Sequence, residues 1–168
     1  MHRLPKNRYG IDLEPAAEDI IKQNFLTLKP SEHWDVARVA VVGNPPFGRS
    51  SNLAIEFFNH AASFATIIAF IVPRTFKKHS VTNRLNLNWK LVHEEDIPTN
   101  SFYLVDGLDN SKDYDVPCVC KIWEKSKNPR VKVVLPTTHE DFQFVSKTSA
   151  DFAIRRVGGL AGKCFTEF

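Results

Sequence analysis

The sequence predicts an α/β fold with a doubly wound, mostly parallel sheet and an antiparallel hairpin at one edge. Short strand-like runs alternate with helix-like runs up to Pro73, which is the pattern of βαβ units. Several strand-like runs are almost continuously apolar and β-branched, as in parallel strands that are buried on both faces. Two more strand-like runs follow Pro73 with no long helix clearly between them, and they predict the hairpin.

The N-terminal runs are short. Residues 9–13 predict a strand that ends at a turn, and Pro15 favours the start of a helix over residues 16–23. Residues 24–28 form a second short apolar segment. Residues 36–43 predict a buried strand, because they are β-branched and end at an Asn-Pro-Pro sequence.

The next runs are longer. Ser50 or Ser51 can cap a helix, because apolar residues recur at helical spacing after them. These apolar residues are Leu53, Phe57, Ala61 and Phe64. Residues 66–73 then predict a buried strand, and residues 89–97 and 116–124 predict the two strands of the hairpin.

Composition places the chain among ordinary globular proteins. It has 168 residues, of which 43% are hydrophobic and 24% are charged, and this excludes collagen-like and disordered classes. The longest apolar run, residues 61–72, is too short to span a bilayer, and the basic N-terminus lacks a signal-peptide pattern. We therefore expect no membrane association and a location in the cytoplasm or in the nucleic-acid compartment of a host cell.

Cysteine usage and charge give weaker information. The three cysteines include no CxxC pair, so we expect reduced thiols and no metal site. The acidic run of residues 93–96 is expected to be solvated, because consecutive strand residues alternate faces. The formal net charge is only +3, but basic residues gather in residues 74–84 and 121–132, where phosphate binding and a solvated surface are both open interpretations.

The most informative segment is the Asn-Pro-Pro-Phe-Gly sequence of residues 44–48, which follows a predicted strand. Each proline fixes its own φ and removes an N–H donor, so Asn44 and the carbonyl of Pro45 become rigidly aimed acceptors. Two acceptors suit an amino group with two hydrogens. Phe47 offers a flat face for a base, and Gly48 lets the backbone turn close to a ligand.

This segment resembles the signature of the class I Rossmann-type amino-methyltransferases, and the chain is most similar to their adenine-N6 members over residues 9–125. The resemblance implies S-adenosylmethionine as cofactor and direct transfer of its methyl group to the exocyclic nitrogen. Asn44, Pro45, Pro46 and Phe47 are the implied catalytic residues. A base in duplex DNA would first be flipped out of its stack.

Cofactor residues are implied by the same resemblance. Asp12 occupies the place of an acidic residue that binds the ribose hydroxyls, with Leu13 beside it and Glu14 as the alternate. Asn24 occupies a place where the family often has Asp and where a polar side chain contacts the cofactor adenine.

The target base and its backbone are expected to meet the segment after the strand of residues 66–73. Phe76 is a candidate for contact with the base. Arg74, Lys77 and Lys78 are candidates for nucleic-acid binding, with DNA preferred over RNA as the expected substrate.

The family's first strand and glycine-rich loop are not found in the sequence, because no glycine precedes Gly10. We therefore expect an N-terminally truncated domain over residues 1–135, with two unpaired sheet edges, for which a partner chain could supply the strand. Residues 136–168 are expected to be a C-terminal extension. The glycines of residues 158–162 suggest a displaced cofactor loop only weakly, because no helix-length segment follows them.

Three functions remain in competition at this stage. The first is adenine-N6 methylation of DNA or RNA. The second is methylation of guanine N2 or of a glutamine amide, for which similar Asn-Pro-Pro-aromatic sequences are used. The third is a non-catalytic remnant that binds nucleic acid or a partner subunit.

Overall fold

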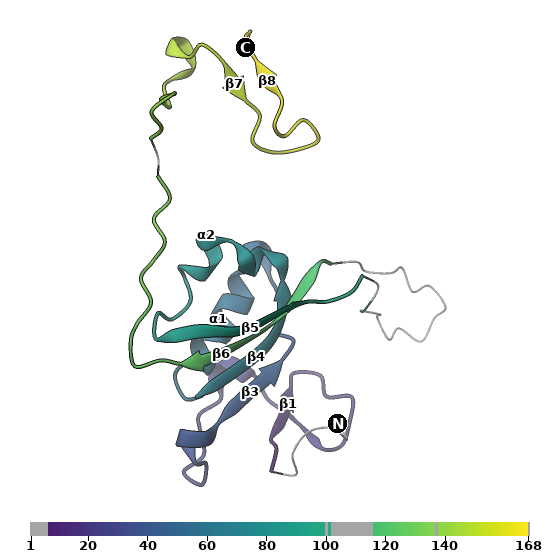
Figure 1. Ribbon diagram of the computed structural model, residues 1–168. Coiled ribbons are helices and arrows are strands. Elements are labelled where there is room, and N and C mark those ends of the chain that lie inside the picture. Colours follow the sequence, from purple (N-terminus) through teal and green to yellow (C-terminus); the bar gives the residue numbers. More distant parts are fainter. Residues whose placement is uncertain (1–6, 100, 102–115, 137, 168) are drawn as a thin grey trace, which may run out of the picture. The chain divides into compact units, whose positions relative to one another are not determined.

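The structure is a computed structural model that describes residues 7–99, 101, 116–136 and 138–167 (Figure 1). It divides into two compact units, Met1–Val133 and Val134–Phe168. The first unit carries the predicted site and most of the regular structure. The second is a small hairpin unit.

The first unit contains both helices and strands. In order they are β1 (Gly10–Asp12), β2 (Ile20–Lys22), the 3₁₀ helices η1 (Phe25–Thr27) and η2 (Val36–Arg38), β3 (Ala40–Gly43), η3 (Arg49–Ser51), α1 (Asn52–Ala61), β4 (Ile67–Pro73), η4 (Arg74–Lys77), α2 (His79–Thr82), β5 (Trp89–Asp96) and β6 (Cys118–Lys125).

The main sheet has four strands in the order β3-β4-β6-β5. Strands β3 and β4 are parallel, whereas β6 is antiparallel to both β4 and β5. A mixed α/β fold with an antiparallel hairpin at one edge is thereby confirmed. Strands β1 and β2 form a separate parallel pair.

The core lies between the sheet and α1. Along β4, Ile68, Phe70 and Val72 are buried on one face, as the alternation of a strand requires. Phe58 of α1 packs edge-on against Trp123 of β6, with 4.9 Å between ring centroids. Burial of such large apolar side chains is the main contribution to the stability of the first unit.

The opposite face of the sheet is more open than a doubly wound fold predicts. Val42 is 62% exposed and Ile67 is 38% exposed, and both project from this face of β3 and β4. Within the described residues, α1 covers the other face. The prediction of a sheet buried on both faces therefore does not hold for this part of the chain.

One local prediction was wrong. Residues 16–23 form turns and then strand β2, not a helix, because Ile21 pairs with Ile11 of β1. Nucleation makes so short a helix unfavourable, and strand pairing prevails. Residues 24–28 contain the 3₁₀ helix η1, whose following residue Leu28 is buried in the core.

The second unit contains η5 (Lys147–Ser149), β7 (Ala153–Ile154) and β8 (Cys164–Phe165). Strands β7 and β8 pair antiparallel, and Gly158 and Gly162, both with positive φ, lie in the connection between them. Gly162 donates to the carbonyl of Arg155 at 2.7 Å, which closes that connection. The glycine-rich residues 158–162 are thus a hairpin loop.

Three observations bear on the remaining predictions. The cysteines Cys118, Cys120 and Cys164 are free thiols, and burial raises the pKa of Cys118. In the described ranges no group of His, Cys, Asp and Glu side chains is arranged to hold a metal ion. No described helix is long and apolar enough to cross a membrane.

Candidate functional site

The Asn-Pro-Pro-Phe segment (residues 44–47) begins directly after β3, as predicted. Pro45 is buried and Phe47 is half-buried, whereas Asn44 is exposed. The segment is therefore held at Pro45 while the amide of Asn44 stays accessible. Because β3 and β4 are parallel neighbours, this segment lies at the same end of the sheet as the residues that follow β4, namely at the carboxyl ends of the two strands.

The backbone after Phe47 adopts unusual conformations. Gly48 has φ 65° and ψ 178°, a region that is essentially restricted to glycine. Ser50 and Ser51 also have positive φ, at 54° and 62°. These three residues reverse the chain between β3 and α1, and the N–H of Ala54 returns to the carbonyl of Phe47 at 3.4 Å.

Gly48 is therefore expected to be essential for the shape of the segment. A Cβ at this position would lie 2.8 Å from Cβ of Leu53, and the positive φ adds strain. We expect Gly48→Ala to destabilise the protein by about 1–3 kcal/mol, which urea unfolding measures. Gly159→Ala is the control, because a Cβ there meets nothing within 4 Å. Equal free energies of unfolding for the two variants would contradict the requirement for glycine at position 48.

The predicted cofactor residues follow the ends of β1 and β2. Asp12 is the last residue of β1, and its Oδ1 accepts the N–H of Glu14 at 2.9 Å. Leu13 is 59% exposed. Asn24 caps η1, with its Oδ1 accepting the N–H of Leu26 at 2.9 Å. No hydrogen bond between described residues joins Asp12 or Asn24 to the Asn-Pro-Pro-Phe segment.

The residues after β4 do not all play the predicted role. Phe76 is fully buried, and its ring centroid lies 6.4 Å from that of Trp123. This corrects the expectation that Phe76 contacts a target base, because its ring belongs to the core. Lys78 is exposed, at the end of the same segment.

Arg74 and Lys77 are exposed enough to meet a ligand but are already in ion pairs. Lys77 Nζ lies 2.7 Å from Asp96 Oδ1 and 3.1 Å from Glu94 Oε1, and Arg74 Nε lies 3.5 Å from Asp96 Oδ1. These carboxylates raise the pKa of Lys77. Exposed ion pairs of this kind contribute little to stability.

A buried lysine joins this network. The side chain of Lys121 on β6 is 3% exposed; its Nζ lies 2.7 Å from Glu94 Oε2 and donates to the carbonyl of Phe76 at 3.0 Å. The sequence prediction of a solvated acidic run missed this pair. Glu94 and Lys121 are opposite each other in the β5–β6 register, so a correct alignment of the hairpin is the signal that identifies it.

The network predicts acid sensitivity. Lys121, and then Lys77, hold the pKa of Glu94 below its usual value, and Lys77 does the same for Asp96. A carboxylate with a lowered pKa in the folded state stabilises the protein fully above its unfolded-state pKa, near 4. That contribution is lost as the pH falls through the lower folded-state value.

Thermal melts between pH 7 and pH 3 test this sensitivity. We expect the melting temperature of the wild type to fall across this range more steeply than that of Glu94→Gln, which cannot titrate at this position. Parallel pH profiles for the two proteins would show that Glu94 is not the cause.

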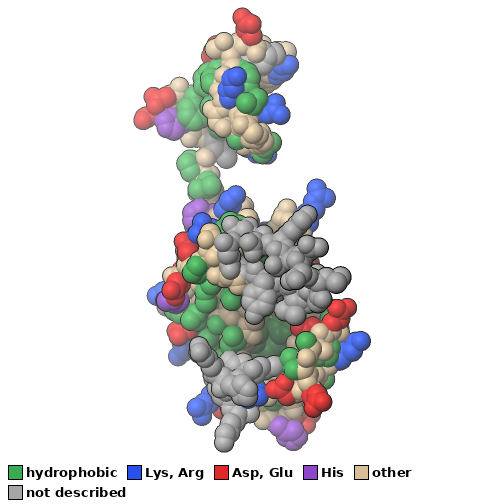
Figure 2. Space-filling view, turned by 90° about the vertical axis from the view of Figure 1, so that its right-hand side faces the viewer, with side chains coloured by type: hydrophobic (Ala, Val, Ile, Leu, Met, Phe, Trp, Pro, Cys, Tyr) green, Lys and Arg blue, Asp and Glu red, His purple; other side chains and the backbone are tan. Residues whose placement is uncertain are grey.

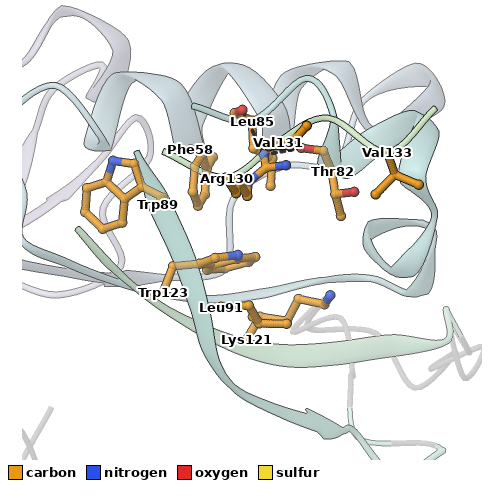
Figure 3. Close-up of a pocket in the computed structure, with 10 residues that line it drawn as sticks. All are labelled: Phe58, Thr82, Leu85, Trp89, Leu91, Lys121, Trp123, Arg130, Val131 and Val133. Atoms are coloured by element: carbon orange, nitrogen blue, oxygen red, sulfur yellow. Dashed lines mark hydrogen bonds between the residues drawn. The ribbon is translucent and has the colours of Figure 1, made fainter. Parts of the chain in front are cut away.

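A cavity of about 220 Å³ is lined by residues of α1, α2, β5 and β6, by Leu85 after α2, and by the chain that follows β6 (Figure 3). Its wall is largely aromatic and aliphatic, with Lys121 and Arg130 as the charged members. Arg130 donates to the carbonyls of Thr82 and Leu85, so it closes the end of α2. The cavity lining includes none of the predicted site residues.

Hydrophobic side chains also gather on the surface of the first unit (Figure 2). In the view from the right-hand side of Figure 1, hydrophobic side chains are visible near the middle of the first unit, and acidic and basic side chains are visible toward its two sides. This mixed surface carries no single strong charge, which agrees with the small formal net charge of +3.

The comparisons with known proteins give one positive finding. A family model described as the EDM2 methyltransferase-like domain matches residues 6–128, which include every predicted site residue. No curated protein matches the chain.

Proposed function

This chain belongs to the EDM2 methyltransferase-like domain family, and from that premise we propose that it methylates the exocyclic N6 amine of adenine in nucleic acid. We propose DNA as the preferred substrate over RNA, and S-adenosylmethionine as the cofactor. The observation that carries the proposal is the Asn-Pro-Pro-Phe segment at the end of β3, with Pro45 buried and Asn44 accessible.

The chemistry assigned to this segment is the acceptance of two hydrogen bonds. The side-chain carbonyl of Asn44 and the main-chain carbonyl of Pro45 accept the hydrogens of the amine, which directs the nitrogen lone pair away from the ring. Both oxygens stabilise the positive charge that develops on nitrogen during transfer. Pro46 fixes the backbone, and the half-buried ring of Phe47 supports the base.

The chain's residues fit the nucleoside part of the cofactor. Asp12 ends β1 with an exposed carboxylate, which suits the two hydroxyls of a ribose, and Asn24 offers an amide after β2. Oδ1 of each residue already accepts a backbone N–H, and this fixes the side chain in place. S-adenosylmethionine, when bound, supplies the activated methyl group.

Nucleic-acid binding is assigned to Arg74, Lys77 and Lys78. All three follow β4, at the end of the sheet where the Asn-Pro-Pro-Phe segment follows β3. Phosphates are expected to exchange with the exposed carboxylate partners of Arg74 and Lys77, so binding should weaken as the salt concentration rises. Phe76 is not part of this assignment.

The proposal is tested by identifying the methylated product. The protein is incubated with labelled S-adenosylmethionine and with DNA or RNA oligonucleotides, and the nucleosides are separated by chromatography and identified by mass spectrometry. N6-methyladenine is the expected product, and oligonucleotides with hypoxanthine in place of adenine are the control, since they lack the amine. Methyl label on guanine N2 instead of adenine N6 would contradict the assignment of adenine as the methyl acceptor.

One observation favours the alternative of a non-catalytic binding domain. Among the described residues β3 pairs only with β4, so its other edge is open, and Val42 on this strand is 62% exposed. An open edge is a template for another strand, which a partner chain would supply. Nucleic-acid binding without binding of S-adenosylhomocysteine would favour this alternative.

A further inference from the structure

Two hydroxyl groups connect the segments that follow β3 and β4. Oγ of Ser51 lies 2.7 Å from Oγ1 of Thr75, which is a hydrogen bond. Ser51 is only 4% exposed, and it is one of two buried polar side chains among the described residues. The bond joins a residue just beyond the Asn-Pro-Pro-Phe segment to the middle of η4 (Arg74–Lys77).

The hydroxyl of Ser51 does not serve the helix that it precedes. Serine at this position commonly accepts a backbone N–H of the first helical turn. Ser51 occupies the N-cap position of α1 yet makes no such bond, and its φ of 62° is left-handed. Two consecutive non-glycine residues in this region persist only where other contacts hold them, and the Thr75 hydroxyl provides such a contact.

The loop from Phe47 to Ala54 connects the Ser51–Thr75 hydrogen bond to the Asn-Pro-Pro-Phe segment. The N–H of Ala54 meets the carbonyl of Phe47 at 3.4 Å, and Gly48 packs so closely on Leu53 that a Cβ would lie 2.8 Å away. The loop from Phe47 to Ala54 is thereby closed on itself. A change in the position of Ser51 therefore displaces Phe47 and the residues before it.

We propose that Ser51 and Thr75 are positioning residues, which set the distance between the Asn-Pro-Pro-Phe segment and η4. The proposal rests on the proposed function for its catalytic consequence, since these two segments would hold the target amine and the nucleic-acid backbone. Neither hydroxyl takes part in the transfer. Their bond keeps the acceptor oxygens aligned while the substrate is bound.

Limited proteolysis tests the anchor without any methyl transfer. Arg49 is an exposed trypsin site inside the loop, and Lys127, exposed after β6, is an internal reference. Thr75→Val and Ser51→Ala each remove one hydroxyl and are expected to speed cleavage after Arg49 several-fold, with cleavage after Lys127 unchanged. Thr75→Ser keeps a hydroxyl and should restore the slow rate. Equal cleavage after Arg49 in all variants with unchanged melting temperature would overturn the proposal.

Kinetics test the consequence for the reaction. Misplacement of a reacting group by about 1 Å costs roughly 10²-fold, so we expect Thr75→Val to lower kcat by at least about tenfold, with the KM for S-adenosylmethionine unchanged. Thr75→Ser should restore kcat. An unchanged kcat in Thr75→Val would overturn the positioning role. Faster cleavage after Arg49 in Thr75→Val, with no transfer by the wild type, would support the anchor and contradict the proposed function.

Discussion

Replacement of Asn44 by alanine is expected to lower kcat for adenine methylation by about 10²–10³-fold, the loss seen when one preorganised hydrogen-bonding group is removed from a transition state. The physical reason is that Asn44 accepts one of the two amine hydrogens, and Pro45 alone cannot direct the lone pair. The exposed position of Asn44 also means that the substitution leaves no cavity in the core. Stability should therefore change little.

The measurement is steady-state transfer of labelled methyl to an adenine-containing oligonucleotide. Asn128→Ala is the matched control, because Asn128 is an exposed asparagine that follows β6, away from the segment in the chain. Binding of S-adenosylhomocysteine should be the same in both variants. A kcat for Asn44→Ala within twofold of the wild type would show that Asn44 does not contact the reacting amine.

Removal of the Glu94 carboxylate is expected to have the largest effect on stability. Glu94→Ala leaves the Lys121 ammonium buried at 3% exposure, with the Phe76 carbonyl as a remaining partner. Breaking a buried pair costs about 3–5 kcal/mol. Because the Glu94 side chain is 32% exposed, water can partly replace it, and we expect a loss of roughly 2–3 kcal/mol in the free energy of unfolding.

A second variant distinguishes the effect of leaving the Lys121 charge unpaired from the effect of losing side-chain atoms at position 94. The double variant Lys121→Met/Glu94→Gln removes both charges, and the methionine fills most of the space of the lysine. It should be more stable than Glu94→Ala in urea unfolding, since no unpaired charge is buried. If the double variant were the less stable of the two, the unpaired Lys121 charge would not be the cause of the stability lost in Glu94→Ala.

The strongly patterned elements were predicted correctly. The buried strand over residues 66–73 appears as β4, and the helix after Ser51 appears as α1. Each has a local apolar pattern long enough to specify its structure. The prediction of a capping serine succeeded only in part, because Ser51 occupies the cap position while its hydroxyl bonds to Thr75.

The wrong predictions involve partners that are distant in sequence. Residues 16–23 have a helix-like pattern, but the pairing of Ile21 with Ile11 decides their structure. Phe76 was expected to contact a target base because it follows the strand of residues 66–73, yet its ring is buried and lies beside Trp123 of β6. Single-sequence patterns do not contain the register that brings such residues together.

The candidate site was predictable to the same extent. The Asn-Pro-Pro-Phe segment could be placed after β3, because its prolines and glycine restrict the backbone locally. The bond between Ser51 and Thr75 was not predicted, since positive φ at two serines is disfavoured and arises from the packing of the two segments.

The central claim, that this domain binds the methyl donor as a methyltransferase does, is tested most directly by calorimetric titration of the purified chain with S-adenosylhomocysteine. Saturable binding to the wild type is expected, with strong weakening in Asp12→Ala, because the carboxylate of Asp12 is assigned to the ribose hydroxyls. No binding by a folded wild-type chain, or equal binding by Asp12→Ala, would contradict the account.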